Sequence, residues 1–237
     1  LSVDVAIVGG GPSGLVASYY LAKNNYKVAI YERKLAPGGG MWGGAMMFNE
    51  IVVQKAALHI LDELSIEYRE FEHDFYVIDS VHAASALIYN ASKAGVKIFN
   101  CTSVEDVVFL DNKVCGIVLN WAPVAGEHLE IDPLVIMAKV VVDSTGHDCD
   151  VAHTLERKNN IKLNTETGKV IGERSLSINE GENSTIDNTK EIYPGLFVTG
   201  MAANGVSGSF RMGPIFGGMI LSGKKVADLI INKIKNT

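Results

Sequence analysis

Residues 3–23 read VDVAIVGGGPSGLVASYYLAK, and this stretch decides the fold. A short segment, residues 3–8, is apolar except for Asp4 and runs directly into glycines, and apolar residues at helical spacing follow over residues 15–23. Continuously apolar strands are typical of parallel sheets that are covered on both faces. A second apolar segment, residues 26–31, comes next. The sequence therefore predicts a strand–turn–helix–strand unit within about 30 residues, the size of a nucleotide-binding βαβ unit.

The turn of this unit carries the pattern Gly9-x-Gly11-x-x-Gly14. Gly9 permits the tight turn, Gly11 lets the backbone approach a pyrophosphate, and Gly14 lets helix and strand pack closely. The helix N-terminus offers N–H groups to phosphate, and Ser13 can donate one more hydrogen bond. Glu32 ends the second strand, where a carboxylate accepts hydrogen bonds from ribose hydroxyls. The pattern favours a dinucleotide site over a glycine-rich turn without a ligand.

The rest of the chain predicts further helices and strands around one sheet. Segments with helical character are residues 53–64, 79–94 and 217–234. Segments with strand character are residues 96–108, 113–121, 139–144 and 196–199, and the first two alternate as antiparallel strands do. Residues 37–44 form a glycine-rich loop, and residues 159–191 are polar and predict a surface excursion. We expect an α/β, Rossmann-like fold of the FAD/NAD type with a central parallel sheet and a small antiparallel layer. It forms a single dinucleotide-binding domain, residues 1–237, with an antiparallel insertion at about residues 96–121.

Composition excludes several classes of protein. The chain has 237 residues, of which 47% are hydrophobic and 20% charged, so it is not disordered. Its formal net charge of -6 argues against a general nucleic-acid-binding surface. No apolar run reaches the roughly 18 residues that a membrane helix needs, and the start shows no signal-peptide pattern. The three cysteines, Cys101, Cys115 and Cys149, form no CxxC pair, which favours a reducing cytoplasm.

Three further sites carry candidate chemistry. Asp132 precedes a proline, and His147 follows a buried strand, so the pair could hold Fe(II) or another divalent metal. On spacing alone, an aspartate and a histidine placed like this are more often unrelated than ligands of one metal. Arg211 lies between glycine-rich turns and could grip a substrate carboxylate, or make a surface ion pair. Arg33 could bind phosphate or stay solvated. Met201 stands where flavoproteins of this type carry an aspartate, which weakens a flavin interpretation.

Read together, these motifs resemble the thiamine thiazole synthase family in its sulfide-using archaeal form. The stretches that carry the resemblance are Gly9 to Gly14, Tyr31-Glu32-Arg33, GGGMWGG at residues 38–44, Asp132-Pro133, STGHD at residues 144–148 and RMGP at residues 211–214. The resemblance implies that NAD is bound and consumed as a substrate. Its ADP-ribose part would condense with glycine and sulfide to give an adenylated thiazole carboxylate. The reaction would depend on Fe(II).

The resemblance also implies roles for single residues. Those expected to contact the NAD-derived nucleotide are Ser13, Glu32, Arg33, Gly40, Val104 and Met201, with Glu130 and Ile131 approaching the nucleotide of a neighbouring protomer. Asp132 and His147 would be the iron ligands, shared across a protomer boundary, and Arg211 would bind the glycine carboxylate. A homo-oligomer, an octamer by resemblance, is therefore expected, without nucleic acid or membrane as a partner.

One position departs from the family. Fungal and plant members place a sulfur-donating cysteine two residues before the metal aspartate, where this chain has Glu130. A carboxylate has no sulfur to give, so sulfide from solution is expected. Three alternatives stay open at this point: an FAD-dependent oxidoreductase of the same fold, a non-catalytic NAD or ADP-ribose binding module, and a sugar-phosphate isomerase.

Overall fold

The central sheet of the protein is built on the βαβ unit that the glycine pattern predicts. In the computed structural model, which describes residues 1–127 and 131–236, β1 (Ser2–Val8) leads into α1 (Pro12–Lys23) and β2 (Val28–Tyr31). Pro12 takes the first helical turn, where its missing N–H has no helical partner to lose. β1 and β2 pair in parallel, so this prediction is confirmed.

The sheet extends from this unit in both directions in the order β11-β12-β9-β1-β2-β6. The strands from β12 to β6 run parallel, and β11 pairs antiparallel with β12 at the edge. The added strands are β6 (Lys97–Phe99), β9 (Leu134–Asp143), β11 (Lys190–Tyr193) and β12 (Leu196–Val198). A hairpin of β7 (Thr102–Leu110) and β8 (Lys113–Trp121) joins β9 antiparallel, which is the antiparallel layer expected from the sequence.

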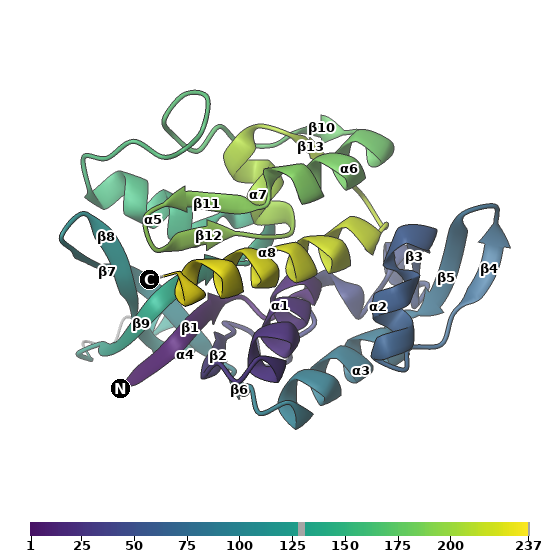
Figure 1. The fold of residues 1–237 in the computed structure, drawn as a ribbon, viewed down its shortest axis with the longest axis horizontal. Helices are drawn as coiled ribbons and strands as arrows, with labels where there is room; N and C mark the ends of the chain where they lie inside the picture. Colours follow the sequence, from purple (N-terminus) through teal and green to yellow (C-terminus); the bar gives the residue numbers. More distant parts are fainter. Residues whose placement is uncertain (128–130, 237) are drawn as a thin grey trace.

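Two apolar clusters explain why consecutive positions at the centre of β1, Val5 to Val8, are all apolar. Val5 and Ile7 face a cluster with α1, α3 (Ser80–Lys93) and α8 (Gly217–Lys235). Ala6 and Val8 face a second cluster under the β7–β8 hairpin, α5 (Asp150–Lys158) and α7 (Met201–Ser207). Figure 1 shows α1 and α8 side by side on the first face of the sheet. Both faces of β1 are therefore buried, as in other parallel sheets.

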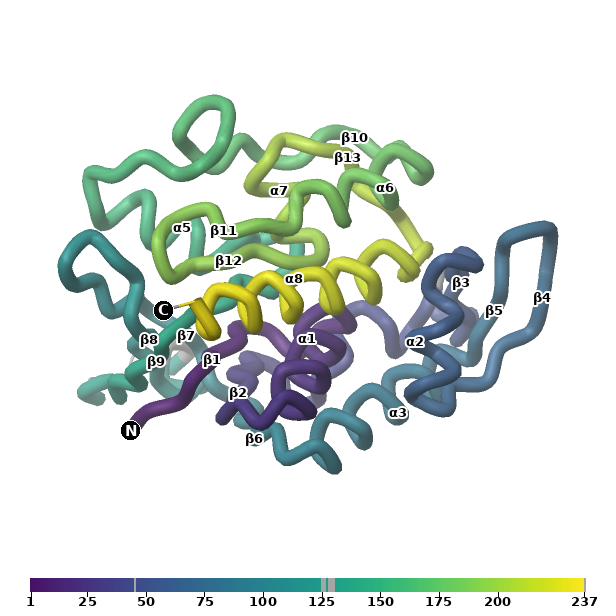
Figure 2. The backbone as a smooth tube through the Cα atoms, in the orientation of Figure 1, coloured from purple at the N-terminus to yellow at the C-terminus, as the bar shows by residue number. Residues whose placement is uncertain are grey.

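Two segments differ from the sequence prediction. Residues 53–64 begin as the end of β3 (Glu50–Gln54), and only α2 (Leu58–Glu63) is α-helical. Ile51, Val52 and Val53 pair with β5 (Phe75–Asp79), which also pairs with β4 (Arg69–Glu72), so tertiary pairing overrides the helical spacing. This small sheet projects from one end of the molecule (Figure 2).

Residues 159–191 are also more ordered than a surface excursion. They contain β10 (Arg174–Leu176), which pairs with β13 (Phe210–Arg211), and α6 (Ile178–Asn188). The buried positions of α6 are Gly181, Glu182 and Thr185, so this helix buries a polar face and leaves no apolar periodicity to detect. The short helix α4 (Ala122–Gly126) follows β8.

Helix α8 closes the fold and packs along α1. Its N-terminal amide at Gly218 donates to the buried carboxylate of Glu182, which fixes the start of α8 against α6. Across the ranges 1–127 and 131–236, we find no helix that combines the length and the apolar character needed to cross a bilayer.

Candidate functional site

A cavity of about 1060 Å³ opens where the carboxyl ends of β1, β2, β9 and β12 meet. Open α/β sheets bind their ligands at this edge. The predicted site residues that line it are Gly9, Gly11, Ser13, Glu32, Arg33, Gly40, Val104, His147, Met201 and Arg211. The volume is at the upper end of ligand sites, about 300–1,000 Å³, which suits a dinucleotide better than a small metabolite.

The glycines of the turn divide into two kinds. Gly9 has a φ of 98°, and a Cβ there would stand 2.4 Å from the carbonyl oxygen of Ser144, so only glycine fits. A Cβ at Gly14 would stand 2.5 Å from the carbonyl oxygen of Gly9, so Gly14 closes the helix onto the turn and does not line the cavity. Around Gly11 and Gly40 a Cβ would meet nothing within 4 Å, which leaves backbone open to a ligand.

Glu32 is 6% exposed and already holds two backbone amides. Its Oε2 accepts from the amide of Gly10 at 2.7 Å, and its Oε1 accepts from the amide of Lys34 at 2.8 Å. A carboxylate has about four acceptor positions, so Glu32 can still accept from a ribose while it braces the turn. The side chain therefore has a structural role that its position in the sequence does not reveal.

Arg33 is engaged with two carboxylates from the other side of the cavity. Its guanidinium lies 2.5 Å from Asp148 and 3.3 Å from Asp150, and all three side chains are about half exposed. The side-chain hydrogen bond to Asp148 raises the pKa of Arg33 further, so it stays a cation. An incoming phosphate would meet an arginine already held in place. The two aspartates are ion-paired with Arg33 and stay partly exposed to solvent.

The loop that carries His147 is built around the buried carboxyl of Asp143. This group accepts from the amide of Thr145 at 3.0 Å, from its hydroxyl at 2.7 Å, and from the amide of Ala152 at 2.9 Å. Burial raises the pKa of Asp143 above its usual value. The bonds tie the end of β9 to α5 and fix the turn that presents His147 to the cavity.

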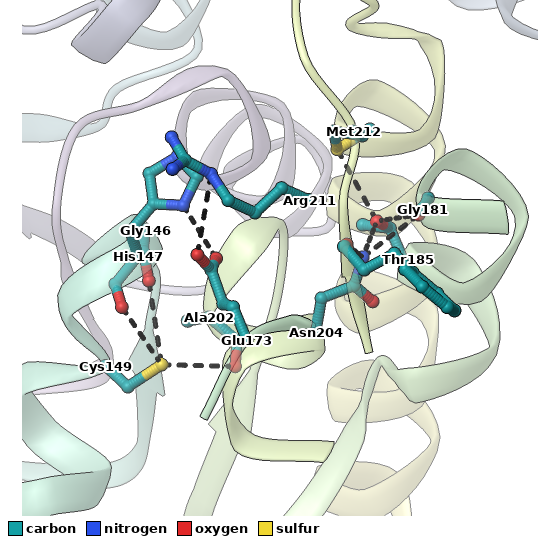
Figure 3. A network of polar contacts seen from close by, with 11 residues as sticks. Gly146, His147, Cys149, Glu173, Gly181, Thr185, Ala202, Asn204, Arg211 and Met212 are labelled. Carbon is teal, nitrogen blue, oxygen red and sulfur yellow. Dashed lines mark hydrogen bonds and ion pairs between the residues drawn. The ribbon is translucent and has the colours of Figure 1, made fainter. Parts of the chain in front are cut away.

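Glu173 contacts both His147 and Arg211 through its carboxylate (Figure 3). Its Oε1 is 2.6 Å from Nδ1 of His147, and its Oε2 is 3.8 Å from Nε of Arg211. The Glu173 side chain is 15% exposed, whereas the other two side chains are more than half exposed. Sequence reasoning missed Glu173 because it lies in the polar segment interpreted as a surface excursion, and no motif marks it.

Asp132 and Ile131 do not line the cavity of the same chain. Asp132 lies two residues before β9 and His147 lies four residues after it, and β9 is ten residues long. A strand rises about 3.3 Å per residue, so β9 is about 30 Å long, and Asp132 and His147 lie beyond its opposite ends. Within residues 1–127 and 131–236, no three His, Cys, Asp or Glu side chains of one chain gather as a metal site. Glu130 falls outside the described residues.

Cys149 is buried beside this loop, as expected for a structural cysteine. Its sulfur lies 3.6–3.7 Å from the carbonyl oxygens of Gly146, His147 and Ala202, any of which can accept from the thiol, and burial raises its pKa. All three cysteines lie in the described part of the chain, and none of them lines the cavity.

The fold and the cavity define the class first: this is an α/β protein with a GxGxxG turn of the kind that binds dinucleotides. The pattern of the Thi4 family matches residues 1–216. The chain is 54% identical over 235 residues to a thiamine thiazole synthase of Desulfosudis oleivorans, covering 99% of this chain and 91% of that one. It is 53% identical to the enzyme of the same name from Pyrococcus abyssi, covering 99% and 90%.

A solved structure agrees with these sequence relatives. The crystal structure of Thermovibrio ammonificans THI4 superposes with a TM-score of 0.95 at 55% identity, covering 99% of this chain and 90% of that one. The chain belongs to the Thi4 family and is an enzyme of the thiamine thiazole synthase type.

Proposed function

We propose that this enzyme makes the adenylated thiazole carboxylate precursor of thiamine from NAD, glycine and free sulfide, with Fe(II), in the cytoplasm. The observation that carries the proposal is one cavity lined by two chemically different sets of residues. The first set, which we call the nucleotide end, is the open glycine backbone with Glu32, and the second, which we call the reaction end, is His147 with Arg211. A nucleotide substrate and a small amino acid can therefore meet in one space.

The nucleotide end supports NAD as the substrate that is bound. Gly11 and Gly40 offer unobstructed backbone, Glu32 offers acceptor positions to a ribose, and Arg33 offers a cation to the pyrophosphate. Val104 and Met201 add apolar wall from β7 and α7. These groups bind and orient the nucleotide, so that its reactive ribose extends toward His147.

The reaction end supports a divalent metal held by two chains. His147 supplies an imidazole at the cavity, and a carboxylate oxygen from Asp132 of a second copy would complete the pair. Imidazole with carboxylate and open positions suits Fe(II). When bound, Fe(II) would supply a site that accepts sulfide and presents it to the substrate. The geometry of one chain alone separates these ligands, so the proposal requires a homo-oligomer.

The surface around Asp132 supports the second copy. Large apolar side chains are exposed there, at the start of β9 and the end of β8: Trp121, Ile131, Leu134, Val135 and Met137. Contiguous exposed apolar residues commonly mark protein interfaces. A partner seated on this surface would bring its Asp132 and Ile131 toward the neighbouring cavity.

Arg211 would orient glycine, and the cysteines would stay out of the reaction. A guanidinium can hold a carboxylate through two parallel hydrogen bonds, which fixes the amino group for condensation with the opened ribose. The buried Cys149 thiol is engaged with carbonyl oxygens, and neither Cys101 nor Cys115 lines the cavity. Free sulfide is therefore the source of sulfur.

The test is anaerobic turnover with NAD, glycine, Fe(II) and sulfide, followed by mass spectrometry of the small molecules. We expect nicotinamide release and an adenylated thiazole, and no thiazole when glycine, Fe(II) or sulfide is omitted. Intact NAD in the complete mixture would refute the proposal in favour of a binding module. Flavin released from the purified protein would refute it in favour of an oxidoreductase.

A further inference from the structure

We infer that Glu173 is a positioning residue that fixes the His147 ring and the Arg211 guanidinium relative to each other. The metal and glycine aspects of this inference rest on the proposed function, whereas the side-chain geometry does not. The carboxylate contacts one side chain with each oxygen, at 2.6 Å and 3.8 Å, and is the least exposed of the three groups. It lies behind the two groups and does not line the cavity itself.

The backbone on both sides of Glu173 is anchored, so its carboxylate has a defined place. The amide of Gly172 donates to the carbonyl of Gly205 at 2.9 Å, and the amide of Arg174 donates to the carbonyl of Ser209 at 2.8 Å. A Cβ at Gly205 would stand 3.6 Å from Cγ of Glu173 and 2.5 Å from Sγ of Cys149. Because Gly205 of α7 has no side chain, the segment with Glu173 and the loop with His147 can both pack against it.

The contact with His147 selects which ring nitrogen can bind a metal. A carboxylate can only accept, so Nδ1 of His147 carries the hydrogen and donates it to Glu173. The lone pair then belongs to Nε2. Histidine ligands of metals commonly donate their second ring nitrogen to a carboxylate, which fixes ring orientation and raises ligand basicity. Glu173 would thus prepare His147 before any metal arrives.

The contact with Arg211 leaves the far end of the guanidinium available. Glu173 faces Nε, so the two terminal nitrogens are not used by this ion pair. Those two nitrogens can grip a carboxylate end on, through two parallel hydrogen bonds. At 3.8 Å the contact between Glu173 and Arg211 is an ion pair without a hydrogen bond, so Glu173 attracts the guanidinium toward the side of the His147 ring that it already holds. Glu173 would therefore couple the site for the metal to the site for the glycine carboxylate.

The test compares wild type with Glu173→Leu, Glu173→Gln and a control, Glu166→Gln, at an exposed glutamate of the preceding segment. Nitrogen-15 NMR of labelled histidine reports the tautomer of His147 without metal, substrate or turnover. We expect the Nδ1–H form in wild type, in the control and in Glu173→Gln, since the glutamine carbonyl can still accept. In Glu173→Leu we expect a shift toward the Nε2–H form.

The Co(II) affinity and the KM for glycine then measure what the loss of Glu173 does to the metal site and to the glycine site. Co(II), followed by its visible absorbance, should bind Glu173→Leu about 10–100-fold more weakly than wild type, the usual effect of losing an outer partner. The KM for glycine should rise in both Glu173 variants, because both lose the charge that holds Arg211, while NAD affinity stays unchanged. Unchanged NAD affinity and circular dichroism show that the variants are folded, and Glu173→Gln keeps the side-chain volume.

The inference is overturned if wild-type His147 is in the Nε2–H form. It is also overturned if Glu173→Leu keeps the wild-type tautomer, Co(II) affinity and glycine KM. Failure of the proposed function gives a different pattern, in which wild type binds no Co(II) and leaves NAD intact while the tautomer still depends on Glu173.

Discussion

Replacing Glu32 by glutamine tests the nucleotide end of the cavity and the turn at the same time. The carboxylate accepts two backbone hydrogen bonds, from Gly10 at 2.7 Å and from Lys34 at 2.8 Å, and is 6% exposed. A glutamine carbonyl can replace one of these acceptors, but its NH₂ group then faces the other N–H. One charge-assisted hydrogen bond is lost, at a cost of about 2 kcal/mol. For a chain of this length that lowers the melting temperature by about 4–8 °C.

The same variant should weaken NAD binding. Glutamine presents one acceptor oxygen where the carboxylate presents two, so at least one hydrogen bond to the ribose is lost, at about 1–3 kcal/mol. Calorimetric titration with NAD measures the affinity, and thermal unfolding without ligand measures the stability. Glu105→Gln, at an exposed position of β7, is the control. Unchanged NAD affinity would remove Glu32 from the ribose site, and an unchanged melting temperature would contradict its bracing of the turn.

Five other variants probe the remaining parts of the site and fold. His147→Ala and Asp132→Ala should each abolish thiazole formation with NAD affinity nearly intact, and full iron content with turnover in either variant would refute the metal assignment. Arg211→Lys should raise the KM for glycine by about tenfold or more, since lysine cannot grip a carboxylate with two prongs; an unaltered glycine dependence would make Arg211 a surface charge. A variant with all three cysteines replaced by serine should still turn over with Fe(II) and sulfide under anaerobic conditions, and wild-type protein that loses the mass of one H₂S per chain would contradict this. Burial raises the pKa of Glu182 from 4.5 to about 7, so folding takes up a proton between these pH values. The free energy of unfolding should therefore fall by about 3 kcal/mol as pH rises from 4.5 to 7. Glu182→Gln should flatten this pH dependence in denaturant titrations at several pH values.

The sequence by itself determined the helices, strands and turns that depend on residues close to one another in the chain. The βαβ unit follows from apolar strands on either side of Gly9, Gly11 and Gly14, and the hairpin follows from the alternation of residues 96–108 and 113–121. Glycine conformation, strand periodicity and helix spacing are short-range physics, so these predictions are confirmed. The cavity at the strand ends also follows, because parallel strands bring their carboxyl ends to one edge.

Tertiary structure alone decided which side chains meet. The length of β9 separates Asp132 from His147, although the sequence offered them as one pair. Glu173 reaches His147 and Arg211 from 26 residues away in one direction and 38 in the other, through a polar segment without periodicity. Arg33 finds Asp148 and Asp150 across the cavity. Contacts between distant segments depend on how the sheet orders its strands and on which loops pack together, and a single sequence carries no local signal for either.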